Sequence, residues 1–437
     1  MKHTITVLIL ILILVLALPV FTGGAFADAA GSDLYAEAFS DRDLSGSYAD
    51  EVFRITLSGS SASSDSDRVS VSGGTVTVSG PGTYILSGTL ENGSIVVDAD
   101  KADKVQLVLN GVTVNSETGA AIYVAQADKV FVTLADGTAN TLKNGGSFTQ
   151  DSKVDAVIYA KDDITLNGSG SLTITSPAGH GITGKDDVTF TGGSFTITSS
   201  DSAVTAKDSL AVAGGSFVIT TEKDGLHAEN NDDNTLGSIY IAGGSFTIRA
   251  GDDAVHAQIL LQIDGGKLDL TADEGLEATW IRLNDGQVTI AATGDGVNAA
   301  HKSDLYTPTI EINGGTLTVT MGPGDTDGID SNGNISITGG TVNVTAGSAF
   351  DYDGTASFTG GTVIVNGQQV SSLPNQMMGG RGGMMGGRGN MAGGLGEMPG
   401  GTMWGRGSMQ GEGSMQGEGG MTGGPGMRGG QGRQAFA

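Results

Sequence analysis

The 437-residue chain contains no cysteine, only 8 prolines and few aromatic side chains, which make up 5% of the residues. Without cysteine it has neither a disulfide scaffold nor a thiolate zinc site. Basic residues are also few, 22 against 48 acidic ones, and the formal net charge of -26 argues against a protein that binds nucleic acid through its phosphates. Scarce proline without a three-residue glycine period excludes collagen.

Glycine is abundant, with 74 residues, and it recurs together with Ser, Thr, Asn and Asp at short, regular intervals. These residues favour turns, and the segments between them are rich in β-branched side chains. The sequence therefore predicts short strands joined by many turns, rather than one globular core built on aromatic residues.

The N-terminus has the pattern of an export signal. Met1-Lys2-His3 supplies a small positive region, an apolar run extends from Val7 to Val20, and Ala25-Phe26-Ala27 matches a cleavage site. We expect residues 1–27 to be a signal peptide and the mature protein to be secreted, extracellular or associated with the cell wall, with no stable membrane insertion after cleavage. The alternative is an uncleaved N-terminal anchor.

The body of the chain is a repeat. Its clearest unit is a Gly-Gly pair, then a small or polar residue, then alternating apolar positions. The pair stands at Gly192-Gly193, Gly214-Gly215, Gly243-Gly244, Gly265-Gly266, Gly314-Gly315, Gly339-Gly340 and Gly360-Gly361, with Asp285-Gly286 as a degenerate copy.

A second motif follows each of these strands: an acidic residue, Gly or Ala, and then Val, Leu or Ile, as in Asp224-Gly225-Leu226 and Asp295-Gly296-Val297. Units this short cannot bury an apolar face alone, but stacked units share one interior. The pattern predicts an all-β parallel β-helix over residues 65–367, preceded by a cap or linker at 28–64. A β-propeller and a β-sandwich are the competing folds.

The segment 374–437 differs from the rest of the chain in composition. It holds 11 of the 13 methionines, scattered among Gly, Arg, Gln and Glu without a period. We expect a disordered tail, because glycine raises the entropic cost of ordering. Self-association, contact with the cell wall and copper binding through thioethers are open functional interpretations, beside a flexible tail without a ligand.

The acidic motifs form a ladder when the units are placed in register. One line holds Asp224, Asp253, Glu274, Asp295 and Asp327, and a second line, three residues later, holds His227, His256, Glu277, Asn298 and Asp330; Asp273 lies beside the first line, and the last unit carries Asp351 and Asp353. Carboxylates stacked at about 5 Å repel one another unless a cation lies between them. Calcium accepts many oxygen ligands, so these carboxylates and Asn298 are predicted to bind Ca²⁺. The alternative is that they only turn the corners between strands.

Other candidate ligand-binding residues are His227 and His256, which lie in consecutive units, and the aromatic side chains Trp280, Tyr306 and Tyr352, which are suited to stacking on sugar rings. The two histidines also allow a zinc site with neighbouring carboxylates. A flat aromatic platform for crystalline cellulose is not evident.

Several runs resemble a bacterial family of secreted carbohydrate-binding β-helix proteins, typified by a clostridial protein that binds cellulose and polygalacturonate. They are Lys223–Ala228, Asp273–Ala278, Gly294–Ala300, Thr307–Gly315, Asp327–Gly333, Phe350–Gly354 and the Lys-Asp turns at Lys161, Lys185 and Lys207. The resemblance covers about residues 60–367. It implies a right-handed parallel β-helix related in shape to pectate lyases, with bound calcium and affinity for acidic plant polysaccharide.

Two units depart from this pattern, because His180-Gly181-Ile182 and Ser202-Ala203-Val204 replace the acidic motif. We expect no metal there. The predicted function is calcium-dependent, non-catalytic binding of polygalacturonate and cellulose. The alternatives are a calcium-stabilised structural or adhesive surface protein and a polysaccharide lyase, for which Lys223 and Lys302 are the candidate bases.

Overall fold

The computed structural model describes residues 38–48, 52–148, 153–323 and 326–375, which belong to one compact unit. The predicted signal peptide and the predicted tail beyond residue 375 lie outside the described residues. The described part of the chain has 38 strands and no α-helix, so it contains no helix able to cross a membrane.

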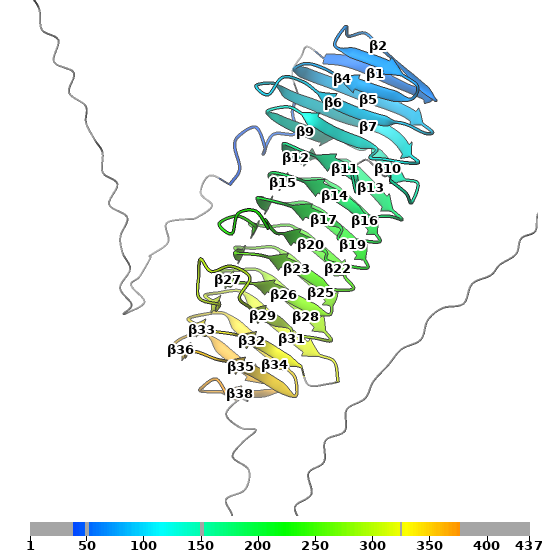
Figure 1. Cartoon of the computed structure of the whole chain (residues 1–437). Helices are drawn as coiled ribbons and strands as arrows, with labels where there is room; N and C mark the ends of the chain where they lie inside the picture. Colours follow the sequence, from blue (N-terminus) through cyan, green and yellow to red (C-terminus); the bar gives the residue numbers. More distant parts are fainter. Residues whose placement is uncertain (1–37, 49–51, 149–152, 324–325, 376–437) are drawn as a thin grey trace, which may run out of the picture. The chain divides into compact units, whose positions relative to one another are not determined.

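The strands lie in three stacks that run along the chain (Figure 1). The first stack is a sheet of 13 strands: β3 (Val69–Ser72), β4 (Thr75–Val78), β6 (Ser94–Asp98), β8 (Ile122–Gln126), β11 (Ala156–Ala160), β14 (His180–Gly184), β17 (Val204–Ala206), β20 (Leu226–Ala228), β23 (Asp253–Ala257), β26 (Glu274–Ala278), β29 (Val297–Ala299), β32 (Asp327–Ser331) and β35 (Ser348–Tyr352).

The other 25 strands form the second and third stacks, joined through the long strands β1 (Val52–Gly59), β5 (Gly82–Leu90) and β7 (Lys104–Ser116). The second stack continues with β9 (Lys129–Leu134), β12 (Asp163–Gly168), β15 (Val188–Phe190), β18 (Ser209–Val212), β21 (Ser238–Ile241), β24 (Leu260–Ile263), β27 (Trp280–Leu283), β30 (Thr309–Ile312), β33 (Asn334–Ile337) and β36 (Ala356–Phe358). The third continues with β10 (Ala139–Asn144), β13 (Ser171–Ser176), β16 (Ser194–Ser199), β19 (Ser216–Thr221), β22 (Ser245–Arg249), β25 (Lys267–Ala272), β28 (Gln287–Ala292), β31 (Thr316–Met321), β34 (Thr341–Thr345) and β37 (Thr362–Val365).

Neighbouring strands within a stack are parallel. The exceptions are the pairings of β1 with β2 (Ser61–Ser64), of β3 with β4, and of β37 with β38 (Gln368–Val370), which are antiparallel and stand at the two ends of the stacks. Each coil contributes one strand to each stack, as β23, β24 and β25 do in sequence. This is a parallel β-helix, as the repeat predicts, and not a propeller or a sandwich.

The two sequence motifs occupy fixed corners of the coil. The Gly-Gly pair joins the second-stack strand to the third-stack strand, and its second glycine has positive φ, as at Gly215 (121°) and Gly244 (109°). The degenerate copy keeps this one requirement, because Gly286 has φ 106°. The acidic motif opens the first-stack strand.

The core is the interior shared by the stacked coils. Its largest side chains include Phe195, Phe217 and Phe246, each about 1% exposed, which stack in successive third-stack strands. Ring centroids are 5.1 Å apart for Phe195 and Phe217 and 4.7 Å apart for Phe217 and Phe246. Phe190 meets Phe217 edge-on at 5.2 Å. Identical side chains thus repeat the same contact from coil to coil.

The N-terminal part differs from the predicted boundary. Strand β1 pairs in parallel with β5, so the stack already begins at Val52, within the segment 28–64 that was expected to be a cap or linker. Residues 38–48 lie against the second stack, where the buried carboxylate of Asp43 accepts a hydrogen bond from Thr165 and pairs with Lys129 at 2.9 Å. This segment is held by polar side chains, which have no hydrophobic periodicity to reveal them.

Candidate functional site

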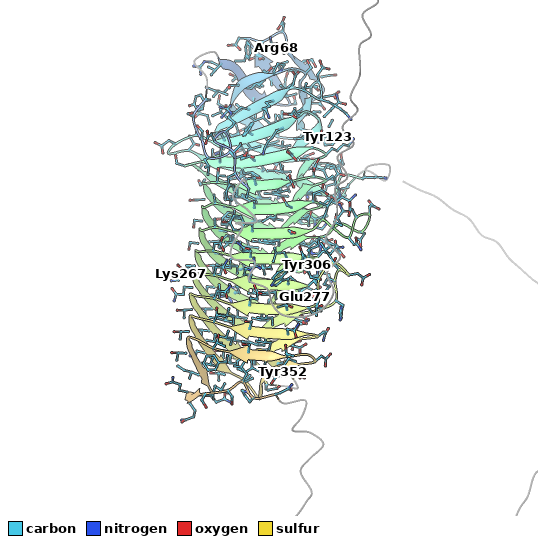
Figure 2. The ribbon with its side chains drawn as sticks, turned by 90° about the vertical axis from the view of Figure 1, so that its left-hand side faces the viewer. Arg68, Tyr123, Lys267, Glu277, Tyr306 and Tyr352 are labelled. Atoms are coloured by element: carbon cyan, nitrogen blue, oxygen red, sulfur yellow. The ribbon has the colours of Figure 1, made fainter. Side chains whose placement is uncertain are left out.

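The outward side chains of the first stack form one continuous row, which we call the outer row. It runs through Tyr123, Tyr159, Thr183, Thr205, His227, His256, Glu277, Asn298, Asp330 and Asp351, each in register with the next. The structure therefore aligns the second line of the predicted ladder in the predicted order. In Figure 2, Tyr123, Glu277 and Tyr352 follow one another from the N-terminal to the C-terminal end of the stack.

The first line of the ladder lies at the corner where each first-stack strand begins, and we call it the corner row. The amide of Gly275 donates to the carbonyl of Asp295, and the amide of Gly296 donates to that of Asp327. A Cβ atom on Gly275 would lie 2.3 Å from the Gly296 carbonyl oxygen. This close approach explains the glycine that follows the acidic residue in this coil, because any Cβ there would clash with the next coil.

Two coils carry the histidine pair, His227 and His256, whose rings stack at 4.6 Å. Each imidazole contacts the corner carboxylate of its own coil through Nδ1, His227 with Asp224 at 2.6 Å and His256 with Asp253 at 2.7 Å. The Nδ1 of His256 also lies 2.8 Å from Glu277. The pair is thus embedded in carboxylates.

Burial alone would lower the pKa of His256, but its hydrogen bonds to Asp253 and Glu277 raise the pKa to about 10. The same balance, with Asp224 and Glu229 as partners, raises the pKa of His227. Burial also favours neutral Glu277, yet His256 and Lys302 lower the pKa of this carboxyl. His256 therefore carries positive charge near neutral pH, and the shift at His227 favours its charged form as well.

A loop between β29 and β30 adds a further cation. Lys302 pairs with Glu277 at 2.8 Å, and the buried hydroxyl of Thr279 accepts hydrogen bonds from the amides of Lys302 and Ser303. The hydroxyl of Ser303 donates to the carbonyl of Asn234, which lies in the loop after β20. Two inserted loops therefore brace each other and hold Lys302 over the outer row.

Three of the predicted calcium ligands have cationic side chains of this protein as partners. Asp224, Asp253 and Glu277 were predicted to bind metal, but imidazole and ammonium groups already face them. The ligand atoms of Asp253, His256 and Glu277 lie within 4.8 Å of one another, as a metal site requires. With no ion bound, the pKa of His256 is raised to about 10 and a protonated imidazole lies between Asp253 and Glu277; calcium or zinc at these residues stays a prediction.

The later coils carry carboxylates that face one another. We call Glu274, Asp295, Asp327, Asp330 and Asp351 the carboxylate cluster. Burial and the charges of Asp295, Asp327, Asp351 and Asp353 raise the pKa of Asp330 to about 7, and burial raises that of Glu274 to about 7, with contributions from Glu277, Asp253 and Asp295. Among the described residues, no Lys, Arg or His forms an ion pair with this cluster.

Two oxygen atoms in this region lack partners. Asn298 is 9% exposed, and its amide nitrogen donates to Glu274 at 2.9 Å, whereas its Oδ1 is buried and accepts no hydrogen bond. The Oδ1 of Asp351 is likewise buried without a donor. An unpartnered buried oxygen is costly unless a cation or water meets it, and hard oxygen donors suit calcium. These side chains supply oxygen donors of the kind that calcium binds, but the described groups of three Asp, Glu or His side chains with ligand atoms within 4.8 Å of one another do not include them.

The remaining acidic candidates have other surroundings. Asp273 is exposed and accepts a hydrogen bond from Thr293 at 2.7 Å, as a turn residue does. Asp353 is exposed at the end of the stack and acts on Asp330 through its charge. Both lie at the edge of the carboxylate cluster.

The aromatic candidates are not alike. Trp280 opens β27 on the neighbouring stack, packs edge-on against Tyr306 at 5.0 Å, and has the guanidinium of Arg282 over its ring at 4.5 Å. Tyr306 is 36% exposed beside Leu305, which is 48% exposed. Tyr352 instead packs against the hydrophobic core of the last coil, so we do not carry it forward as a sugar-stacking residue.

Some contributing residues escaped the sequence prediction. Glu229 contacts Nε2 of His227 at 3.3 Å, and its spacing of two residues along a strand could have indicated that both side chains share a face. Thr279, completely buried, has no such signal, because its role arises from a loop that approaches from a later coil.

The sequence matches a known protein family and one curated protein. A sequence model of the family described as carbohydrate-binding domain-containing protein matches residues 72–281 and 272–373. A protein of this description from Acetivibrio thermocellus is 42% identical over 103 residues, which are 23% of this chain and 36% of the relative. The matched part is thus little more than a third of the relative's length.

A solved structure is also similar. It is described as the polysaccharide lyase-like protein from C. thermocellum, as a gadolinium derivative, and is 30% identical with a TM-score of 0.49. The match covers 63% of this chain and 98% of that one.

Proposed function

Because this chain belongs to the family of carbohydrate-binding domain-containing proteins, we propose that it is a secreted, non-catalytic protein that binds polysaccharide. The ligand we propose is an acidic plant cell-wall polysaccharide, polygalacturonate, with cellulose as a further ligand. Tight binding depends on calcium held by the carboxylate cluster.

The observation that carries this proposal is the carboxylate cluster with its two unpartnered oxygens. Cations there lower the repulsion among the carboxylates, and because Asn298 and Asp351 lie two coils apart, each of their Oδ1 atoms meets a cation of its own. Because calcium takes six to eight oxygen ligands, protein side chains at one surface leave positions for other donors. Uronate carboxylates can take those positions, so that calcium bridges the protein and the polysaccharide.

The direct test is retention of the mature protein on polygalacturonate and on cellulose, with calcium or with EGTA. We expect strong retention on polygalacturonate with calcium and, at physiological salt, a large reduction with EGTA. Magnesium serves as the ionic control, because it has the same charge but keeps its water ligands more firmly. Retention that EGTA does not reduce would contradict the calcium bridge, and no retention on either polymer would contradict polysaccharide binding.

Calcium affinity should rise with pH between about 5 and about 8. Glu274 and Asp330 have pKa values of about 7, so protons compete with calcium below that pH. In the calcium-free protein the sign of the stability change is opposite: the folded chain keeps protons that the unfolded chain has already released, so stability falls as pH rises through 7. Calorimetric calcium titrations and thermal unfolding in EGTA measure both. A dissociation constant that does not change with pH would contradict this assignment.

Tyr306 is the aromatic candidate with the most accessible ring. We expect Tyr306→Ala to weaken glycan binding about threefold to tenfold, since an aromatic contact contributes roughly 0.5–1.5 kcal/mol. Tyr306→Phe is the matched control, because it keeps the ring, and it should bind like the wild type. Affinity electrophoresis on the polysaccharide reports the change. Equal binding by the alanine variant would remove Tyr306 from the site.

Lyase activity is less well supported. A base must be unprotonated to take the sugar C5 proton, but Glu277 outweighs burial and raises the pKa of Lys302. The other candidate, Lys223, lies 3.4 Å from Asp252. A purely structural calcium rod would keep its calcium-dependent stability and show no retention on polysaccharide, so the retention assay separates that alternative.

A further inference from the structure

A second charged feature lies upstream of the histidine pair. Lys161, Lys185 and Lys207 each follow directly after a first-stack strand, and the amides of Lys185 and Lys207 donate to the carbonyls of Ala160 and Gly184 in the preceding coil. We call these three residues the lysine row. Successive strands lie about 4.8 Å apart, so the row brings like charges close together, which is unfavourable without a compensating anion.

Two of these lysines lie over the outer row. The Nζ atom of Lys161 is 5.4 Å from the ring centroid of Tyr123, and that of Lys185 is 5.5 Å from the ring centroid of Tyr159. Both lysines are exposed, and among the described residues neither forms an ion pair. Lys207 differs, because it pairs with Asp232 at 2.5 Å.

The acidic residues of the same turns point away from the lysine row. Asp162 accepts a hydrogen bond from the amide of Ala127 at 3.1 Å. Asp163 and Asp187 line a cavity of about 420 Å³ beside residues 38–43 and the second stack, and Asp186 lies within 4.8 Å of both. Asp155, whose charge acts on Tyr159, has its Oδ1 buried. In the turns after β11 and β14 the carboxylates thus lie away from the ammonium groups, whereas Asp155, which precedes β11, adds a negative charge near Tyr159.

We propose that Lys161, Lys185 and Tyr123 form a calcium-independent subsite for carboxylate groups of the same acidic polysaccharide. This inference rests on the proposed function and extends it upstream along the outer row. The ammonium groups form charge-assisted hydrogen bonds with uronate carboxylates, and the part-exposed ring of Tyr123 packs against a sugar. Tyr159 is buried and supports Lys185 from below.

The subsite also offsets the repulsion between this acidic chain and an acidic polysaccharide. A chain with a net charge of -26 repels a polyanion, and the carboxylate cluster attracts one only through calcium. Two exposed ammonium groups that have no ion-pair partner in the described part of the chain offer an attractive region in the same row. A linear uronate chain lying along the first stack would meet ammonium groups upstream and bridging calcium downstream.

The test uses the mature protein and an oligogalacturonate, in EGTA at low ionic strength and again with calcium. We expect the wild type to keep weak binding in EGTA that salt suppresses, and Lys161→Gln with Lys185→Gln to weaken this binding by about tenfold. Glutamine retains most of the side-chain length over the tyrosine rings, and equal melting temperatures check the fold. Lys267→Gln, on the opposite edge in Figure 2, is the matched control and should bind as the wild type does.

Three results would overturn the subsite: no binding of the wild type in EGTA, undiminished binding of the double variant, or an equal loss in Lys267→Gln. None of them affects calcium-dependent retention of the wild type, so failure of the subsite differs from failure of the proposed function. A neutral cello-oligosaccharide should respond to none of these lysine changes. A loss of neutral-sugar binding in the double variant would overturn the assignment to carboxylates.

Discussion

Replacing Asp295, Asp327 and Asp330 together by asparagine is expected to abolish the stabilisation that calcium gives to the folded protein. Calcium at about a hundred times its dissociation constant adds roughly 2.7 kcal/mol to the free energy of unfolding of the wild type. The triple variant should show no rise in melting temperature with calcium and no calcium-dependent retention on polygalacturonate. In EGTA it should be at least as stable as the wild type, because removal of the charges relieves repulsion at Asp330.

The asparagine substitutions remove charge but keep a backbone hydrogen bond, so the triple variant can be compared directly with the wild type. The Oδ1 of Asp295 accepts a hydrogen bond from the amide of Asp327 at 3.0 Å, and an asparagine keeps that acceptor. Asp269→Asn is the matched control, since Asp269 is exposed on β25 of the third stack. Thermal unfolding with calcium and with EGTA reports the difference. A triple variant that keeps the full calcium shift would place calcium elsewhere and overturn the assignment of the carboxylate cluster.

Phe217→Ala is expected to lower the free energy of unfolding by about 3–5 kcal/mol, the usual cost of removing a buried aromatic ring from a packed interior. Phe217 is 1% exposed and contacts Phe190, Phe195 and Phe246, so its removal breaks the stack in the middle. Because each coil contacts only its neighbours, the loss should appear first as unfolding of the adjacent coils.

Val218→Ala is the control for this prediction, because Val218 is the next residue, points outward and is 48% exposed. It should change stability by no more than about 0.5 kcal/mol. Urea unfolding followed by circular dichroism and hydrogen exchange measure both the overall and the local effect. A loss below about 1 kcal/mol in Phe217→Ala would mean that the neighbouring rings close the cavity.

Much of the fold was predictable because the repeat is encoded locally. The second glycine of each pair meets a backbone requirement, positive φ, that other residues rarely satisfy, and Gly286 retains it where the first glycine is lost. The alternation of apolar residues after each pair has the period of a strand. The start of the stack was missed, because β1 lies in a segment without the Gly-Gly pair.

The candidate site was predictable only in part. Register between coils follows from the spacing of the motifs, and so His256, Glu277 and Asn298 align as expected. Which carboxylates have a cation nearby does not follow from spacing. Lys302 reaches Glu277 from a loop 25 residues further along the chain, and its position depends on the buried hydroxyl of Thr279.

The sequence by itself determined the stacked β-coils, the order of the ladder and the strongly acidic character of the chain, because these depend on residue type and on the spacing of the repeat. Only the tertiary structure decided how the ladder divides. Its upstream half has His227, His256 and Lys302 as ion-pair partners, whereas its downstream half has no such partner among the described residues and the Oδ1 of Asn298 accepts no hydrogen bond. The physical reason is that the charge state and the ligands of a buried carboxylate depend on groups brought within a few ångströms by other coils and loops, which no local pattern encodes.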